Sequence, residues 1–191
     1  LDQNHETKFF LFLHYWDVHY DYIPPEPYDS IFDIGYTGSI DGKNFETNPL
    51  IHGGLSRADL DHLLALYDGE IAFTDNHLGK LLRKLEQLQL TSNTMIIVTA
   101  DHGDEFFEHE GKGHCTTLYD EVIKVPLIIF DPWFEPDKPL LRYSAQVVDI
   151  APTVLSRLGI TIPDTFDGYD LFSVVKGENT PPTRTVFSET S

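Results

Sequence analysis

The sequence has little of several features that would place a protein in a familiar class. One cysteine among 191 residues excludes a disulfide within the chain, so cysteine usage does not indicate the redox compartment. No apolar run approaches the roughly 18 residues that a membrane-spanning helix needs, and the first residues do not have the pattern of a signal peptide. Because the chain begins with Leu1 and ends at Ser191, just after a pattern typical of the beginning of another strand, we expect both ends to be truncated.

Positive charge is also scarce, with 13 Lys and Arg residues against 31 Asp and Glu residues. The formal net charge of -18 argues against a nucleic-acid partner and against an anionic membrane surface. This field would repel an anionic substrate, so a site for one would need its own local cations. The apolar fraction of 41% is that of a globular chain, and the length suits one α/β domain, or one domain and part of another.

Three short apolar runs predict buried β-strands, at residues 8–14, 94–100 and 125–130. Between the first two, apolar residues recur at helical spacing from the N-cap candidate Ser56 to about Leu90, which predicts one long helix. A strand, a long crossover helix and a second strand form a unit of parallel type. We therefore expect an α/β fold with a mostly parallel sheet flanked by helices.

The sequence also bears on the continuity of the long helix and predicts a second helix and a fourth strand. Gly69 and Gly79 weaken the pattern of the long helix, so a kink or break at either is an alternative to a continuous helix. Asp149 is expected to cap a second helix that ends at Leu158. Residues 185–188 are a candidate for a fourth, truncated strand.

Residues 20–55 are rich in Pro, Gly, Asp and Tyr and predict a long loop without helix or strand. A loop of this length is uncommon in a compact domain and more often covers or lines a site than merely connects two elements. Its aromatic side chains either stack on a sugar or aryl group of a substrate or pack the loop onto the domain. We favour the packing role.

Ionisable residues gather where two of the predicted strands end. His14, Asp17 and His19 follow the first strand, and Asp101 and His102 follow the second. In open α/β sheets, ligands bind outside the carboxyl ends of the strands, and a carboxylate beside an imidazole offers two ligands to a divalent cation. The alternatives are structural, namely an Asp that forms a turn, a histidine beside a helix cap, and a solvated acidic loop.

The order of the motifs along the chain is more specific than any one of them. Y-D-G-E-I-A-F-T-D is followed by L-G-K-L-L-R-K-L, by T-M-I-I-V-T-A-D-H-G-D-E-F-F-E-H and by K-G-H-C-T-T-L-Y-D-E-V-I-K-V-P-L-I-I. This series closely resembles the carboxyl-terminal half of the catalytic domain of a sulfatase of the alkaline phosphatase superfamily. F-L-F-L-H-Y-W-D-V-H-Y before it, and V-V-D-I-A-P-T-V-L-S-R-L-G-I and F-D-G-Y-D-L after it, also resemble segments of that family.

The resemblance implies a metal-dependent sulfuric ester hydrolase with an alkaline phosphatase-like fold. Asp101 and His102 match the family's second pair of metal ligands, and Ca²⁺ is the expected ion, with Mg²⁺ and Mn²⁺ as alternatives. His19 matches the histidine that contacts the sulfate and assists the leaving group. His114 falls where the family has a Lys or His that touches the sulfate, and Lys112 is a second candidate for that charge. The implied substrate is a small-molecule or saccharide sulfate ester.

The chain departs from the family's pattern at the nucleophile. In the family this is a cysteine converted to formylglycine, in a C-x-P/A-x-R motif near the amino terminus. Residues 1–191 contain no such motif, and Cys115, in H-C-T-T-L, is expected to be structural. We therefore expect a partial catalytic domain that lacks its N-terminal half, with residues 20–55 as a loop or lid and residues 160–191 as the beginning of a C-terminal subdomain.

Two other functions are compatible with these residues. A phosphonate or phosphodiester hydrolase of the same superfamily is the alternative among enzymes, because the distinguishing nucleophile lies outside the chain. A non-catalytic fragment that binds only an anion or a partner is the alternative outside enzymes. The resemblance suggests a periplasmic, extracellular or lysosomal location. The remaining ionisable residues after the second strand are expected to be solvated loop surface, namely Asp104, Glu105, Glu108, His109 and Glu110.

Overall fold

The chain folds into two compact units, which are described separately. The computed structural model describes residues 1–2, 6–134, 144–178 and 185–190. The first unit contains residues 1–130 and 190–191, and the second contains residues 131–189.

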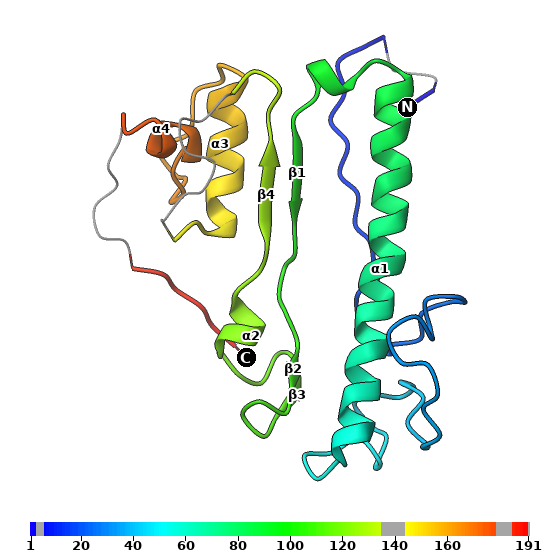
Figure 1. Ribbon diagram of the computed structural model, residues 1–191. Helices are drawn as coiled ribbons and strands as arrows, with labels where there is room; N and C mark the ends of the chain where they lie inside the picture. Colours follow the sequence, from blue (N-terminus) through cyan, green and yellow to red (C-terminus); the bar gives the residue numbers. More distant parts are fainter. Residues whose placement is uncertain (3–5, 135–143, 179–184, 191) are drawn as a thin grey trace. The chain divides into compact units, whose positions relative to one another are not determined.

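The first unit combines one long helix with short strands (Figure 1). Its elements in chain order are α1 (Arg57–Gln87), the 3-10 helix η1 (Thr91–Asn93), β1 (Ile96–Thr99), β2 (Glu105–Phe106), β3 (Lys112–Gly113), α2 (Asp120–Ile123) and β4 (Leu127–Phe130). The strands predicted at residues 94–100 and 125–130 are therefore present as β1 and β4. The α/β class of the fold is confirmed.

The sheet pairing differs from the expected parallel arrangement. β1 pairs with β4 in antiparallel register, with Ile96 opposite Phe130 and Thr99 opposite Leu127, and β2 pairs with β3 as an antiparallel hairpin. Both described pairings are thus antiparallel, and the mostly parallel sheet is not seen among the described residues.

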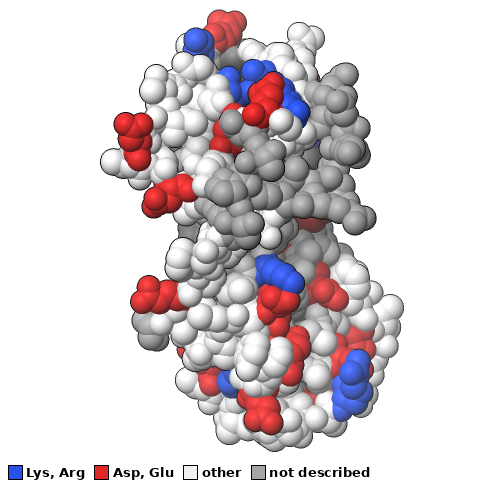
Figure 2. Space-filling model, turned by 90° about the vertical axis from the view of Figure 1, so that its left-hand side faces the viewer, with Lys and Arg blue, Asp and Glu red and all other residues white. Residues whose placement is uncertain are grey.

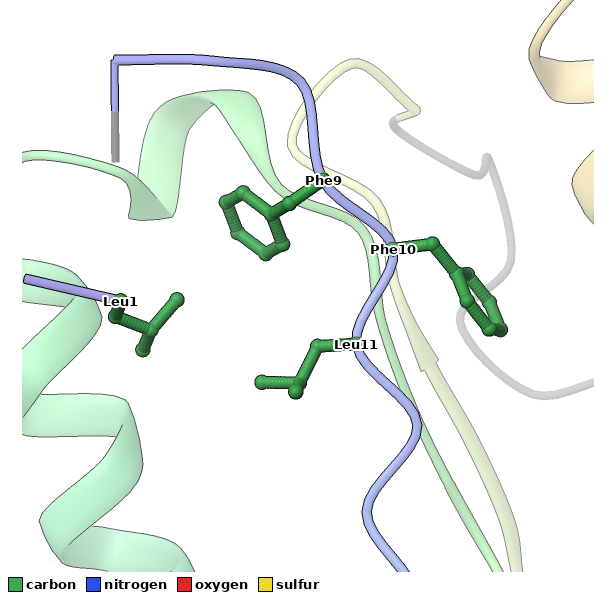
Figure 3. Close-up of a pocket in the computed structure, with 4 residues that line it drawn as sticks. All are labelled: Leu1, Phe9, Phe10 and Leu11. Carbon is green, nitrogen blue, oxygen red and sulfur yellow. The ribbon is translucent and has the colours of Figure 1, made fainter. Parts of the chain in front are cut away.

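Residues 8–14 are not a strand in the structure, so that prediction is wrong for the described fold. Their backbone is nevertheless extended. Leu1, Phe9, Phe10 and Leu11 line a small apolar pocket, and Figure 3 shows the side chains of Phe9 and Leu11 on the side of Leu1 and that of Phe10 on the opposite side of its segment. Phe10 remains 86% exposed. The segment has the alternation of a strand but no strand partner among the described residues, which is why the prediction fails.

Helix α1 begins and continues as its sequence predicts. The Ser56 hydroxyl oxygen accepts a hydrogen bond from the Asp59 backbone N–H at 3.1 Å, and the hydroxyl donates to the Asp59 carboxylate at 2.7 Å. Leu63, Leu66 and Leu85 lie on its buried face. The helix runs through Gly69 and Gly79 without a break.

Gly69 has a packing role that explains a glycine inside the helix. A Cβ atom at this position would lie 2.4 Å from the carbonyl oxygen of Tyr28 and 2.9 Å from the ring of Pro24. The absence of a side chain therefore lets the loop at residues 24–28 pass directly over the helix. At Gly79 the nearest atom is the end of the Arg83 side chain, at 3.3 Å, which is free to move.

The long loop at residues 20–55 contributes four of the seven buried residues of the main apolar cluster in this unit. Its members Tyr22, Ile40, Phe45 and Ile51 cluster with Leu63 and Leu66 of α1 and with Phe106 of β2. The packing role favoured for the loop is confirmed for Tyr22, which is fully buried. The loop therefore anchors α1 to the β2–β3 hairpin.

The second unit contains η2 (Val147–Asp149), α3 (Ile150–Arg157) and α4 (Leu171–Val175). Asp149 lies at the N-cap position of α3 as predicted, but its carboxylate accepts hydrogen bonds from the backbone N–H groups of Gln146 and Tyr169, both at 2.8 Å. It therefore ties the loop before α4 to the beginning of α3. The strand predicted at residues 185–188 is wrong, because no strand is assigned there.

The surface carries the negative charge expected from the composition. On the face shown in Figure 2, acidic side chains are widely spread and basic ones are fewer. No helix in the described part of the chain is long and apolar enough to cross a membrane.

The two helix glycines should respond in opposite directions to the same substitution. We expect Gly69→Ala to lower the free energy of unfolding by about 1–3 kcal/mol, because the new methyl group overlaps the Tyr28 carbonyl. Gly79→Ala is the matched control and should raise it by up to about 1 kcal/mol, since alanine is the better helix former and only a mobile side chain must shift. Urea unfolding of both variants measures the difference. Equal effects at the two positions would contradict the packing role of Gly69.

Candidate active site

The segment after β1 carries the predicted metal ligands and is held against α2. The Gly103 N–H donates to the Val122 carbonyl at 2.8 Å, and a Cβ at Gly103 would lie 2.1 Å from the Glu121 carbonyl oxygen. Glycine is required here by this close approach of two backbones. Asp101 and His102 thus leave the strand at a fixed point of the fold.

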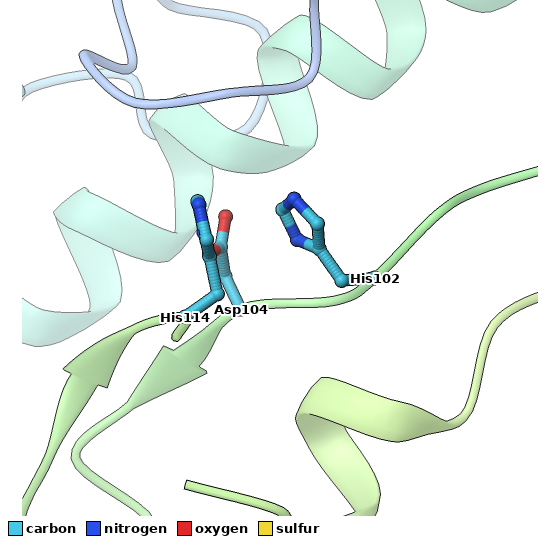
Figure 4. Close-up of side chains that lie close together, drawn as sticks. All are labelled: His102, Asp104 and His114. Atoms are coloured by element: carbon cyan, nitrogen blue, oxygen red, sulfur yellow. The ribbon is translucent and has the colours of Figure 1, made fainter. Parts of the chain in front are cut away.

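Three side chains of this segment and the β2–β3 hairpin form one cluster. The candidate ligand atoms of His102, Asp104 and His114 all lie within 4.8 Å of one another. Figure 4 shows the three side chains extending to the same side of the chain. His102 and Asp104 precede β2 and His114 follows β3, so the antiparallel hairpin brings them together, with the rings of the two histidines 3.8 Å apart.

Asp104 is buried at the centre of this cluster, although sequence reasoning placed it on the surface. Its Oδ1 lies 2.6 Å from Nδ1 of His114, and its Oδ2 accepts a hydrogen bond from the Tyr22 hydroxyl at 2.7 Å. The side chains of Asp104 and His114 are only 5% and 9% exposed. Burial, reinforced by the Asp104 charge, raises the pKa of Tyr22, so its hydroxyl remains a donor.

His19 approaches the cluster from a different part of the chain. Its ring centroid lies 5.2 Å from that of His114, and the neighbouring Tyr20 ring stacks on His114 at 5.0 Å. Burial and a hydrogen bond from its hydroxyl to Glu46 raise the pKa of Tyr20 to about 12. The structure therefore brings His19, His102 and His114 together, as expected for residues of one site.

The three histidines are fixed in the same way. Nδ1 lies 2.5 Å from the Tyr20 carbonyl oxygen in His19, 3.0 Å from the Gly103 carbonyl oxygen in His102, and 2.6 Å from Asp104 in His114. A carbonyl oxygen only accepts, so Nδ1 of His19 and of His102 is the donor. Nε2 is left in each ring to meet a ligand, which is the arrangement that orients functional histidines.

Glu70 of α1 holds the loop that carries His19, and sequence reasoning missed it. Its Oε1 accepts a hydrogen bond from the Ile23 N–H at 2.8 Å. Burial raises its pKa to about 7, with the Asp17 and Asp21 charges acting in the same direction. A signal was present in the sequence, since Glu70 falls on the same helical face as the buried Leu63 and Leu66.

Lys112 makes contacts inside the fold. Its ammonium group donates to the carbonyl oxygens of Phe45 and Ile51 at 2.6 and 2.8 Å and lies over the Phe45 ring. Burial lowers its pKa. These bonds tie β3 to the long loop at residues 20–55.

Asp101 lies at the edge of the cluster. Its carboxylate is 78% exposed, accepts a hydrogen bond from the His102 N–H at 3.1 Å, and lies 3.8 Å from Nε2 of His102. A carboxylate oxygen and a ring nitrogen this close suit a divalent cation. The ligand role of Asp101 and His102 stays a prediction.

A second acidic group, formed by Glu105, His109 and Glu121, has a structural explanation. Glu105 is fully buried, so its predicted place on the surface is wrong. Its carboxylate accepts hydrogen bonds from the N–H groups of His109 and Gly111, at 3.1 and 2.7 Å, and from the Thr117 hydroxyl at 2.9 Å. It therefore organises the hairpin loop between β2 and β3.

Comparison with known proteins identifies the family of this chain. A sequence model described as Sulfatase matches residues 1–160. The chain therefore belongs to the sulfatase family of the alkaline phosphatase superfamily. Arylsulfatase K of Bos taurus is 34% identical over 121 residues, which are 62% of this chain and 22% of that protein. The chain spans about a fifth to a third of the length of the curated relatives it matches.

Solved structures include proteins of similar fold. The phosphonate monoester hydrolase SpPMH from Silicibacter pomeroyi has a TM-score of 0.63 and 27% identity, covering 78% of this chain and 28% of its own. A protein solved in complex with its substrate D-glucosamine-2-N,6-O-disulfate has a TM-score of 0.52 and 25% identity, covering 67% of this chain and 26% of its own.

The raised pKa of Glu70 predicts a pH-dependent stability. Because the folded pKa of about 7 exceeds the ordinary 4.5, the contribution of Glu70 is fully present below about pH 4.5 and is lost as the pH rises through 7. Glu70→Gln removes this dependence. As the pH rises over this range, the free energy of unfolding of the variant should therefore increase relative to that of the wild type by up to about 3 kcal/mol. Urea unfolding across the range measures the gain. Glu86→Gln, at an exposed position of α1, is the control and should show none.

Proposed function

We propose that residues 1–191 form part of the catalytic domain of a metal-dependent sulfatase that hydrolyses sulfate esters. The proposal rests on one observation, that the His114 ring lies close to the rings of both His19 and His102. His102 and His114 are more than 80 positions further along the chain than His19. Each of these rings is fixed at Nδ1 and presents Nε2. A histidine side chain can carry the local positive charge that an anionic substrate requires in a chain of net charge -18.

In this proposal Asp101 and His102 hold a divalent cation, with Ca²⁺ as the first choice and Mg²⁺ or Mn²⁺ as alternatives. Their neighbouring oxygen and nitrogen atoms support the assignment. His102, Asp104 and His114 are a second set of possible ligands, but both Asp104 oxygens already accept hydrogen bonds. A cation bound here would stabilise negative charge on a sulfate oxygen.

His19 and His114 are proposed to bind the sulfate through Nε2. The protonated His19 would give its Nε2 proton to the departing alcohol oxygen, because Nδ1 is already committed to the Tyr20 carbonyl. Lys112 was the second candidate for a sulfate contact. Its bonds to two carbonyl oxygens favour an anchoring role, so His114 is the preferred cation at that position.

The nucleophile is proposed to lie outside residues 1–191, as a formylglycine formed from a cysteine. Cys115 is exposed, and neither Pro or Ala nor Arg stands in the places of the expected motif around it. We also propose that the rest of the domain pairs with residues 8–14, whose extended apolar chain has no strand partner among the described residues, and completes a mostly parallel sheet.

A saccharide sulfate ester is the proposed substrate class. The related protein solved with D-glucosamine-2-N,6-O-disulfate supports this choice. A phosphonate ester is the second candidate, because the phosphonate monoester hydrolase from Silicibacter pomeroyi has a similar structure. Both substrates present a tetrahedral anion to the same groups.

Matched substrates separate the two candidates. We expect the full-length protein that carries this chain to hydrolyse an aryl sulfate faster than the corresponding aryl phosphonate ester. Asp101→Ala should lower kcat/KM for the sulfate by more than about 100-fold, because the cation would lose a ligand. Asp120→Ala removes an exposed carboxylate outside the site and is the control. A preference for the phosphonate would make the second candidate the function.

Calcium binding tests whether residues 1–191 supply only part of the proposed metal site. Calorimetric titration of residues 1–191 with calcium chloride should give weak or undetectable binding, because this segment supplies only some of the ligands that a calcium ion takes. Tight binding that Asp101→Ala abolishes would show that these residues already form a complete metal site.

A further inference from the structure

A buried chain of hydrogen bonds from Tyr22 through Asp104 to His114 connects the loop that carries His19 with His114. Tyr22 follows His19 by three positions on the same loop, and its hydroxyl donates to Oδ2 of Asp104. Oδ1 of the same carboxylate lies 2.6 Å from Nδ1 of His114. The His19 loop and the β2–β3 hairpin are therefore connected through Asp104.

The surroundings of this chain make its geometry rigid. Tyr22 is fully buried and packs edge-on against Phe45 and Tyr67, with ring centroids 5.1 and 5.4 Å away. Its hydroxyl thus has one position, and so has the carboxylate that receives it. A ring held by a buried carboxylate at one nitrogen has little freedom to rotate, which fixes the direction of the other nitrogen.

On the basis of the function proposed above, we propose that Asp104 is a positioning residue that fixes the ring of His114 beside His19, with Tyr22 orienting the Asp104 carboxylate. Asp104 acts through His114 and does not itself contact the sulfate. The two sulfate-binding groups then keep one spacing, with ring centroids 5.2 Å apart, before any substrate arrives. Preorganised groups of this kind lower the barrier without rearrangement during the reaction.

Kinetics of the full-length protein on an aryl sulfate test this role. Asp104→Ala should lower kcat/KM by about 10- to 100-fold, as expected for loss of a group that orients a functional histidine. Asp104→Asn should restore most of it, because the amide oxygen still accepts from Nδ1 and the amide nitrogen can donate to Tyr22. Tyr22→Phe should cost about threefold to tenfold, the effect of one hydrogen bond.

The double variant separates positioning from independent structural roles. Tyr22→Phe combined with Asp104→Ala should be no worse than Asp104→Ala alone, because Tyr22 acts through the carboxylate. Effects that multiply would overturn the proposal. Tyr67→Phe is the matched control, since it removes a hydroxyl from the same aromatic cluster and leaves the bond between Tyr22 and Asp104 in place, and its kcat/KM should be unchanged.

A measurement that does not depend on turnover tests the role of Asp104 separately from the proposed function. In ¹⁵N-histidine-labelled full-length protein, the Nδ1 signal of His114 should change in Asp104→Ala, and titration with inorganic sulfate should shift His19 and His114 together in the wild type. An unchanged Nδ1 signal would overturn the role of Asp104, even in an active enzyme. Inactivity on both ester classes with the Nδ1 signal as expected would reject the proposed function alone. Metal binding through His114 that Asp104→Ala abolishes would make the cluster a metal site and overturn the proposal.

Discussion

The burial of Tyr22 is the interaction on which the first unit depends, because this residue belongs at once to the apolar core and to the candidate site. Its ring fills the space between the long loop, α1 and β2, while its hydroxyl meets Asp104. Burying an aromatic ring of this size contributes on the order of 2–3 kcal/mol, and leaving its hydroxyl without a partner would offset much of that gain. Core packing and site geometry are thus satisfied by the same placement of one side chain.

Buried carboxylates organise the loops around this centre. Glu70 and Glu105 are both buried and accept hydrogen bonds from loop backbone N–H groups, Glu70 from Ile23 and Glu105 from His109 and Gly111. Burying a carboxylate is unfavourable unless such partners are supplied, so each acid allows only loop conformations that supply them. Loops without helix or strand become specific structures in this way, in a chain whose many other acids lie on the surface.

Sequence periodicity predicts the elements that local patterns form. It fails where the structure depends on contacts between residues far apart in the sequence. The cap at Ser56 and the apolar spacing of α1 are local, and so are the apolar runs of β1 and β4, all of which are found. Asp104 and Glu105 looked like surface residues because their burial depends on Tyr22, on Thr117 and on the hairpin pairing, none of which a local pattern encodes. The extended segment at residues 8–14 fails for the same reason, since a strand is defined by its neighbour.

The contacts that position the histidines of the site differ from those that would complete the sheet. The contacts that place His19, His102 and His114 are made by Glu70, Tyr22, Asp104 and nearby carbonyl groups, all within residues 1–130. The apolar side chains of residues 8–13, in contrast, are partly or largely exposed and contribute nothing to those contacts. Because hydrogen bonds and core packing within this unit determine the positions of the histidines, pairing of residues 8–14 with further strands would add stability without having to rearrange them.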